Sequence, residues 1–333
     1  MSETRRFNRF SKGLVVFVSS LLALSAWFYF LDGFPTETKI VEIPQGLGLS
    51  AIAEKLEVEG VVRRAEVLFF SAFLSGTHRK LKHGEYVFSA GEAPYAVHRK
   101  LRRGEVSLKR VTFPEGITLV QMAGILDASQ IVSREEFLAV AENSEYSTKK
   151  LGVDVSSLEG FLFPDTYFFA RDCSAEKVIE TMLDRFREVY ATLGIASPQP
   201  DIKEIVTIAS LIEKETAFPP ERPLVSAVIR NRLRKGMKLE FDPTVIYALG
   251  EKFDGNIRKK DLSFPSPYNT YVVSGLPPGP IAAPGLDSIR AALEPADVDY
   301  LYFVSNGGGV HVFSSTYRDH QNAVKRLLKK EKQ

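Results

Sequence analysis

Two glutamates lie near the C-terminal end of a predicted helix at residues 201–216, which reads DIKEIVTIASLIEKET. Glu213 and Glu215 fall near opposite edges of the apolar stripe of this helix, so its periodicity does not choose between them. The bulky neighbours Leu211 and Ile212 would desolvate Glu215 more, and desolvation raises a carboxyl pKa towards the range that a general acid needs. The alternative is a helix end whose glutamates are solvated, with Glu213 paired to a lysine.

Other acidic residues are candidates to act beside such an acid. Glu159 and Asp165 interrupt the aromatic stretch LEGFLFPDTYFF at residues 158–169, and both are candidates to face a cleft. Asp242 precedes Pro243 and is either a second acid or a helix cap. Distances between these carboxyl groups do not follow from the sequence.

The sequence indicates neither a metal site nor a cofactor. Three histidines in the N-terminal third lack metal-ligand spacing, namely His78, His83 and His98. The glycine run at residues 307–309 lacks the phosphate-loop pattern and lies between two predicted strands, as a hairpin turn would. We therefore expect the chemistry to depend on side chains alone.

The whole chain has the composition of an ordinary folded protein. Its 333 residues are 44% hydrophobic and 25% charged, which excludes disordered, collagen-like and coiled-coil proteins. This length favours roughly two domains. The 43 basic and 41 acidic side chains leave a net charge of +2, so overall charge identifies no partner. Cys173 is the single cysteine and cannot form an internal disulfide.

The N-terminal segment predicts a membrane anchor. Residues 14–31, LVVFVSSLLALSAWFYFL, contain no charge and would span about 27 Å as a helix. Charged residues flank this run, namely Arg5, Arg6, Arg9 and Lys12 before it and Asp32 after it. The positive-inside rule predicts a cytoplasmic tail at residues 1–12, a single transmembrane anchor at 13–31 and an extracytoplasmic remainder. A cleaved signal peptide is the alternative, but no small-residue cleavage triplet follows the run.

An internal repeat follows the predicted anchor. Residues 41–62, VEIPQGLGLSAIAEKLEVEGVV, and residues 111–132, VTFPEGITLVQMAGILDASQIV, match at many apolar positions. Each copy predicts a strand, a turn at Pro-x-Gly and a short helix. Such units resemble pieces of LysM modules, which bind glycans that contain N-acetylglucosamine. A small α+β packing unit without a ligand is the alternative, since a fold does not fix a function.

Between the two copies, residues 78–110 carry an excess of basic side chains. Most such runs are solvated faces, and this one gives weak support for proximity to lipid headgroups or anionic wall polymers. The predicted topology places the run outside the cytoplasm and therefore argues against a nucleic-acid partner.

Several longer motifs beyond the repeat share one resemblance. The motifs are EGFLFPDTY, EKET, GMKLEFDPTVIYALG, SPYNTYVVSGLPPGPIAAPG and YLYFVSNGGGVHVFS, in this order. Together they resemble the YceG-like family of endolytic murein transglycosylases over nearly the whole chain after the anchor. The resemblance implies an α+β fold with an N-terminal transmembrane helix, a LysM-like glycan-binding subdomain at residues 38–108 and a lysozyme-like mixed catalytic domain at 109–333.

The resemblance also implies a catalytic residue and a reaction. The catalytic glutamate of the family is the second of EKET, which is Glu215 here, and Thr216 stands where other lytic transglycosylases have serine. Protonated Glu215 would donate to the oxygen that links N-acetylmuramic acid to N-acetylglucosamine, and its carboxylate would then take the proton of the muramyl C6 hydroxyl. That hydroxyl closes a 1,6-anhydro ring, and no water is used. A muramidase that hydrolyses the same bond and a non-catalytic wall-binding scaffold are the alternatives.

Substrate contacts are expected from the SPYNTY motif and from Glu159. Tyr268, Asn269 and Thr270 offer a phenol, an amide and a hydroxyl that suit sugar hydroxyl and acetamido groups. A structured turn is the competing interpretation, since prolines precede these residues. The expected partners are peptidoglycan strands and, through the anchor, lipid of the bacterial inner membrane, with cell-wall synthases as further candidates.

Overall fold

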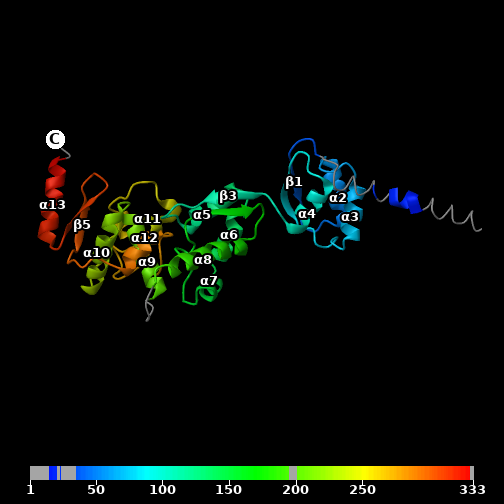
Figure 1. Ribbon diagram of the computed structural model, residues 1–333. Helices are drawn as coiled ribbons and strands as arrows, with labels where there is room; N and C mark the ends of the chain where they lie inside the picture. The colour runs from blue at the N-terminus through cyan, green and yellow to red at the C-terminus, as the bar shows by residue number, and fades with distance from the viewer. Residues whose placement is uncertain (1–14, 21–22, 24–34, 195–200, 331–333) are drawn as a thin grey trace, which may run out of the picture. The chain divides into compact units, whose positions relative to one another are not determined.

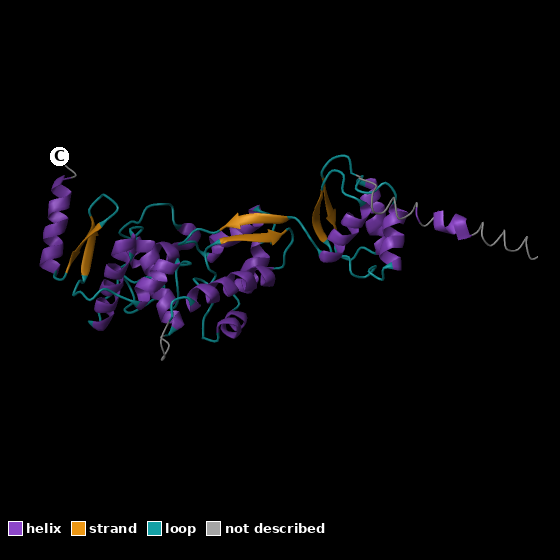
Figure 2. Ribbon diagram, viewed as in Figure 1, coloured by secondary structure: helices purple, strands orange, loops and turns teal. Residues whose placement is uncertain are grey.

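Small two-stranded sheets alternate with helices along the chain in the computed structural model, which describes residues 15–20, 23, 35–194 and 201–330. Figures 1 and 2 show helices as the main component, with short strands between them. The strands of the described residues form three two-stranded sheets. This arrangement confirms the predicted α+β class. The predicted tail at 1–12 lies outside the described residues, as does most of the predicted anchor at 13–31. Among the residues that are described, no helix is both long and apolar enough to cross a bilayer.

The described chain divides into two compact units. The first contains the residues up to Lys109 together with Phe168–Asp172, and the second contains the rest. Strands β1 and β2 of the first unit are antiparallel, with Val41 opposite Tyr86, and the helices cover their apolar side chains. The elements of this unit are β1 (Lys39–Ile43), α2 (Leu49–Val58), α3 (Ala65–Leu74), β2 (Gly84–Phe88) and α4 (Pro94–Arg103).

The second unit begins within the strand pair β3 and β4, and it ends with an antiparallel hairpin of β5 and β6 followed by a helix. Its elements, of which β3 and β4 belong in part to the first unit, are β3 (Leu108–Thr112), α5 (Leu119–Ala128), α6 (Arg134–Ala141), α7 (Ser144–Leu151), β4 (Thr166–Ala170), α8 (Ala175–Ala191), α9 (Ile202–Glu215), α10 (Arg222–Arg234), α11 (Asp242–Leu249), α12 (Leu286–Leu293), β5 (Tyr302–Ser305), β6 (His311–Ser314) and α13 (Tyr317–Lys330). A short 3₁₀ turn, Pro219–Glu221, precedes α10.

The internal repeat is visible in the backbone. Both copies fold as a strand, a turn and a helix, and a second helix follows each of them. Gly46 and Gly116 occupy the same place in the two turns with φ of 87° and 76°, a conformation that favours glycine. The first turn is exposed, whereas Gly116 is buried in the second unit. The two copies therefore share a backbone but have different surroundings.

Helix α9 lies at the centre of the second unit and packs against α10, α11 and α12. It begins after Asp201, whose carboxylate accepts a hydrogen bond from the Lys203 N–H at 2.9 Å. Every residue from Ile205 to Ile212 is buried, including Ser210, which accepts from the Ile281 N–H at 3.1 Å. The helix ends at Glu215, because Thr216 adopts an extended backbone with φ of −136°. Packing on several sides thus fixes the place of the last turn.

A close contact between distant motifs supports α9. Gly160 of the EGFLFPDTY motif has φ of 82°, and a Cβ there would lie 2.4 Å from Pro280. Only glycine fits such a site without displacing its neighbour. The glycine and proline residues of the two motifs therefore bring residues 160 and 280 together beside Val206 of α9.

Candidate active site

Glu215 is the last residue of α9, and its carboxyl group is sheltered. The residue keeps partial exposure, but its Oε2 atom is shielded from solvent and has no hydrogen-bond partner among the described residues. Burial raises the pKa of Glu215 to about 7; the negative charge of Asp242 also raises it, and Arg232 opposes the shift. A carboxyl group with this pKa is partly protonated at neutral pH, as a general acid must be.

Glu213, two residues earlier, is used differently. Its side chain is 7% exposed and faces the Arg222 guanidinium, with Oε1 3.5 Å from Nη2. Its Oε2 accepts a hydrogen bond from the Gly285 N–H at 3.0 Å. Glu213 is therefore bound within the protein, whereas one oxygen atom of Glu215 is unused by the described residues. Helical periodicity alone left both residues as candidates.

Asp242 and Tyr271 lie near Glu215: the charge of Asp242 raises the pKa of Glu215, and the charge of Glu215 raises the pKa of Tyr271. Asp242 is the exposed first residue of α11, and the Tyr271 hydroxyl donates to its Oδ1 at 2.6 Å. Burial raises the pKa of Tyr271, and the charges of Asp242 and Glu215 raise it further. Of the second acids named from the sequence, the structure brings Asp242 into electrostatic range of Glu215. Tyr271 was not predicted as a site residue, although it directly follows Tyr268, Asn269 and Thr270 in SPYNTY.

Asn269 and Thr270, predicted to bind substrate, are both fully buried. The Asn269 amide donates to the carbonyl oxygens of Leu262 and Phe264, and its oxygen accepts from the Tyr271 N–H. The Thr270 hydroxyl oxygen accepts from the Phe241 N–H at 2.9 Å, next to the start of α11. These bonds hold the turn that carries Tyr271. Direct contact of Asn269 or Thr270 with a sugar stays a prediction.

Glu159 and Tyr268 both contact Tyr247. Glu159 is 4% exposed, and both its oxygens lie 3.2 Å from the Leu119 N–H at the start of α5. The Tyr247 hydroxyl donates to Oε2 of Glu159 at 3.4 Å, and the Tyr247 and Tyr268 rings are 4.9 Å apart. Burial raises the pKa of Glu159 to about 7, while the bonds from Leu119 and Tyr247 lower it. A substrate-binding role for Glu159 and Tyr268 stays a prediction.

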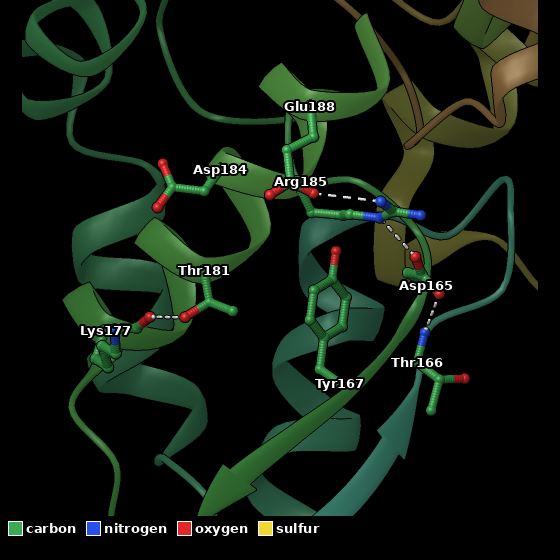
Figure 3. A pocket seen from close by; sticks show the side chains of 8 residues that line it. All are labelled: Asp165, Thr166, Tyr167, Lys177, Thr181, Asp184, Arg185 and Glu188. Atoms are coloured by element: carbon green, nitrogen blue, oxygen red, sulfur yellow. Dashed lines mark hydrogen bonds and ion pairs between the residues drawn. The ribbon is translucent and has the colours of Figure 1, made fainter. Parts of the chain in front are cut away.

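Asp165 lines a pocket of about 380 Å³ between β4 and α8, shown in Figure 3. Its Oδ2 accepts from the Arg185 Nε at 2.8 Å, and its Oδ1 accepts from the Thr166 N–H at 2.7 Å. Arg185 also contacts Glu188 at 3.3 Å. The carboxyl group of Asp165 is thus paired with a cation, and Glu215 is not among the residues that line this pocket.

Metal ligation finds no support at this site. Within the described ranges, no group of three or more histidine, cysteine, aspartate or glutamate side chains is arranged to hold a metal ion. What the arrangement provides is a sheltered carboxyl group at a helix end, beside an exposed carboxylate that a tyrosine holds. Such a pair suits proton transfer to a polar substrate.

The chain is similar to proteins of one family. Residues 41–326 match the profile of the YceG-like family. An endolytic murein transglycosylase of Bacillus subtilis is 32% identical over 305 residues, which cover 86% of this chain and 84% of that relative. An endolytic murein transglycosylase of Streptococcus pneumoniae is 30% identical over 356 residues, with 93% of this chain and 64% of the relative covered.

A solved structure is similar as well. The crystal structure of a YceG-like protein from Listeria monocytogenes matches with a TM-score of 0.57 and 32% sequence identity. The match covers 87% of this chain and 100% of that one. Sequence and fold thus agree over the same large part of the chain.

Proposed function

Since this chain belongs to the YceG-like family, we propose that it is an endolytic murein transglycosylase with Glu215 as its catalytic acid and base. It cleaves the glycan strands of peptidoglycan internally, between N-acetylmuramic acid and N-acetylglucosamine. The observation that carries the assignment of Glu215 is its sheltered carboxyl group at the end of α9, whose Oε2 has no partner among the residues that the structure describes and whose pKa burial raises to about 7.

The proposed reaction needs one proton-transfer group. Protonated Glu215 donates its proton to the oxygen of the glycosidic bond, and the bond from this oxygen to the muramyl anomeric carbon breaks. The muramyl C6 hydroxyl oxygen attacks the same carbon, and the Glu215 carboxylate removes the proton of that hydroxyl. The products are a free N-acetylglucosamine end and a 1,6-anhydromuramyl end, and Glu215 is protonated again.

The products distinguish this reaction from hydrolysis. A specific observation favours a muramidase as the second candidate, because Asp242 supplies a carboxylate near Glu215, and hydrolases commonly use two such groups. Mass spectrometry of the glycan ends released by the full-length protein separates the two reactions. We expect anhydromuramyl ends; reducing muramyl ends, heavier by one water than the anhydro form, would instead support the muramidase.

Activity should fall as the pH rises through about 7, because Glu215 then loses the proton that it must donate. In Asp242→Asn the neighbouring negative charge is absent, so the pKa of Glu215 falls and the alkaline limb of kcat/KM moves to lower pH. We expect activity at pH 8 to drop several-fold. The pH–rate profile of the variant measures this change.

Asp254→Asn is the matched control, since Asp254 is exposed and paired with Arg258 at 2.5 Å. Its profile should follow that of the unmodified protein. An unchanged alkaline limb in Asp242→Asn would show that Asp242 does not act on the catalytic acid.

The first unit is proposed to bind glycan as the LysM-like subdomain, and the second to be the lysozyme-like catalytic domain. A hollow of about 420 Å³ between α3 and α4 supports the first assignment. Tyr95 lines it with 41% exposure, and the Arg99 guanidinium lies 5.7 Å from its ring centre. Aromatic and cationic side chains around a concave site suit a polar polymer. The predicted anchor would keep both units on the extracytoplasmic side of the inner membrane.

We expect Tyr95→Ala to weaken binding to purified sacculi several-fold, because the ring that lines the hollow is lost. Turnover of a short soluble glycan should not change, because Tyr95 and Glu215 belong to different units. Tyr95→Phe keeps the ring and serves as the control. Sedimentation with sacculi measures the binding, and equal binding by all three proteins would place the glycan site elsewhere.

A further inference from the structure

We propose that Glu221 and His311 are positioning residues for the catalytic acid, which they hold through Thr216. This inference rests on the proposed function, since Glu215 must be the group whose position matters. None of the three residues is assigned a contact with substrate. They fix the point at which the chain leaves α9, one residue after Glu215.

The carboxylate of Glu221 accepts hydrogen bonds from three donors, which come from two distant parts of the chain. The Thr216 hydroxyl donates to its Oε2 at 3.1 Å. The His311 backbone N–H donates to Oε1 at 2.5 Å, and His311 Nδ1 lies 2.7 Å from Oε2. Thr216 and Glu221 are 3% and 5% exposed, so water competes little for these bonds. Hydrogen bonds to a buried carboxylate are among the stronger ones in proteins.

The donor state of His311 follows from its partner. An ionised carboxylate only accepts hydrogen bonds, so Nδ1 of His311 carries the proton that is shared with Glu221. The imidazole ring packs edge-on against Phe303, with ring centres 5.3 Å apart, and lies 6.4 Å from Phe313. Phe303 and Phe313 are paired across the β5–β6 hairpin. The hairpin therefore holds the ring, and the ring holds the carboxylate.

The link to Glu215 is the extended residue Thr216. The last turn of a helix frays unless its end is fixed. The Thr216 hydroxyl donates to Glu221 and also accepts from the Phe218 N–H at 3.1 Å, while the Thr216 N–H donates to the Ile212 carbonyl at 3.2 Å. The side chain and backbone of this residue are thus fixed on both sides. The adjoining Glu215 carries few constraints of its own, because its Oε2 has no hydrogen-bond partner within the described ranges.

Two pairs of variants test the proposal in the full-length protein. His311→Phe fits among the aromatic rings but cannot donate, whereas His311→Asn offers a side-chain N–H in place of Nδ1. Thr216→Val removes the hydroxyl, and Thr216→Ser keeps it. We expect kcat to fall about 10- to 100-fold in His311→Phe and Thr216→Val, with KM nearly unchanged, because a small misplacement of a catalytic group has effects of this size. His311→Asn and Thr216→Ser should recover most of the lost kcat.

Release of anhydromuramyl ends from a soluble glycan gives kcat and KM, and circular dichroism checks the fold. A wild-type kcat in folded Thr216→Val or His311→Phe would overturn the proposal, as would an equal loss within each pair. If His311→Phe does not fold, the threonine pair decides. Glu215→Gln separates the two hypotheses. If this variant is active, the proposed function of Glu215 is wrong. If it is inactive while Thr216→Val is fully active, only the positioning role is wrong.

Discussion

Replacing Glu215 with glutamine should lower the release of anhydromuramyl ends by at least about 10³-fold while the protein stays folded. Glutamine has nearly the shape of glutamate, but it neither donates an acidic proton nor accepts one from the muramyl C6 hydroxyl. Mass spectrometry of the glycan ends measures the loss. Glu213→Gln is the matched control on the same helix. It should retain most of the activity, because Glu115 and Asp287 still lie beside Arg222 and the glutamine oxygen can still accept from the Gly285 N–H.

The same variant should be more stable than the unmodified protein at alkaline pH. Below pH 4.5 the carboxyl group is protonated in both the folded and the unfolded states. Between 4.5 and 7 the unfolded chain releases the proton while the folded protein keeps it, so stability falls as the pH rises through this window. Glu215→Gln lacks this loss. Its free energy of unfolding, relative to that of the unmodified protein, should therefore be about 2–3 kcal/mol higher at pH 8 than at pH 4.

Urea denaturation at the two pH values measures that difference. A folded but inactive Glu215→Gln with no such gain would mean that the carboxyl group is not desolvated as the structure places it. Full activity in the variant would remove Glu215 from the reaction altogether.

Arg222→Met should lower the free energy of unfolding by about 3–5 kcal/mol, because it leaves a buried charge without its counterpart. The Arg222 side chain is 9% exposed and lies 3.5 Å from Glu213, with Glu115 at 3.8 Å and Asp287 at 3.4 Å. Removal of the guanidinium group leaves the Glu213 carboxylate, which is 7% exposed, without a positively charged partner at this position. Urea denaturation measures the loss.

Arg290→Met is the control, because Arg290 pairs with Asp287 at an exposed site and should change stability by less than about 1 kcal/mol. The double variant Arg222→Met/Glu213→Gln should recover part of the loss, since the stranded charge is then gone. An equal loss in the single and double variants would show that packing of the arginine stem, rather than the charge, is responsible.

Local patterns in the sequence predicted the elements well. The apolar spacing of DIKEIVTIASLIEKET predicted a helix at residues 201–216, and α9 spans Ile202–Glu215. The matching apolar positions of the repeat predicted a strand, a turn and a helix in each copy, which the structure confirms. Such features depend on residues that are close in the sequence, so the spacing of apolar residues is enough to predict them.

The contacts around the candidate site could not be predicted from the sequence in the same way. Glu221 and His311 are 90 residues apart, and no local period relates a 3₁₀ turn to a strand. The same holds for Asp242 and Tyr271, which are 29 residues apart. Asn269 and Thr270 have polar side chains, which favoured exposure, but their bonds to loop carbonyls and to α11 stabilise them in the interior. Only the folded chain shows which polar groups are already satisfied.

The second turn of the internal repeat connects two distant segments of the second unit. The Gly116 N–H donates to the Ala283 carbonyl at 2.8 Å, and Lys214, the neighbour of the proposed catalytic acid Glu215, donates to the Gly116 carbonyl at 3.0 Å. Its counterpart Gly46 is exposed and has no such neighbour in the part of the chain that the structure describes. A chimera assembled from two relatives must therefore take residues 110–132 and 201–216 from one parent, whereas the first copy must be exchanged together with the rest of its own core, because Val41 and Ile43 pack with Tyr86 and Phe88.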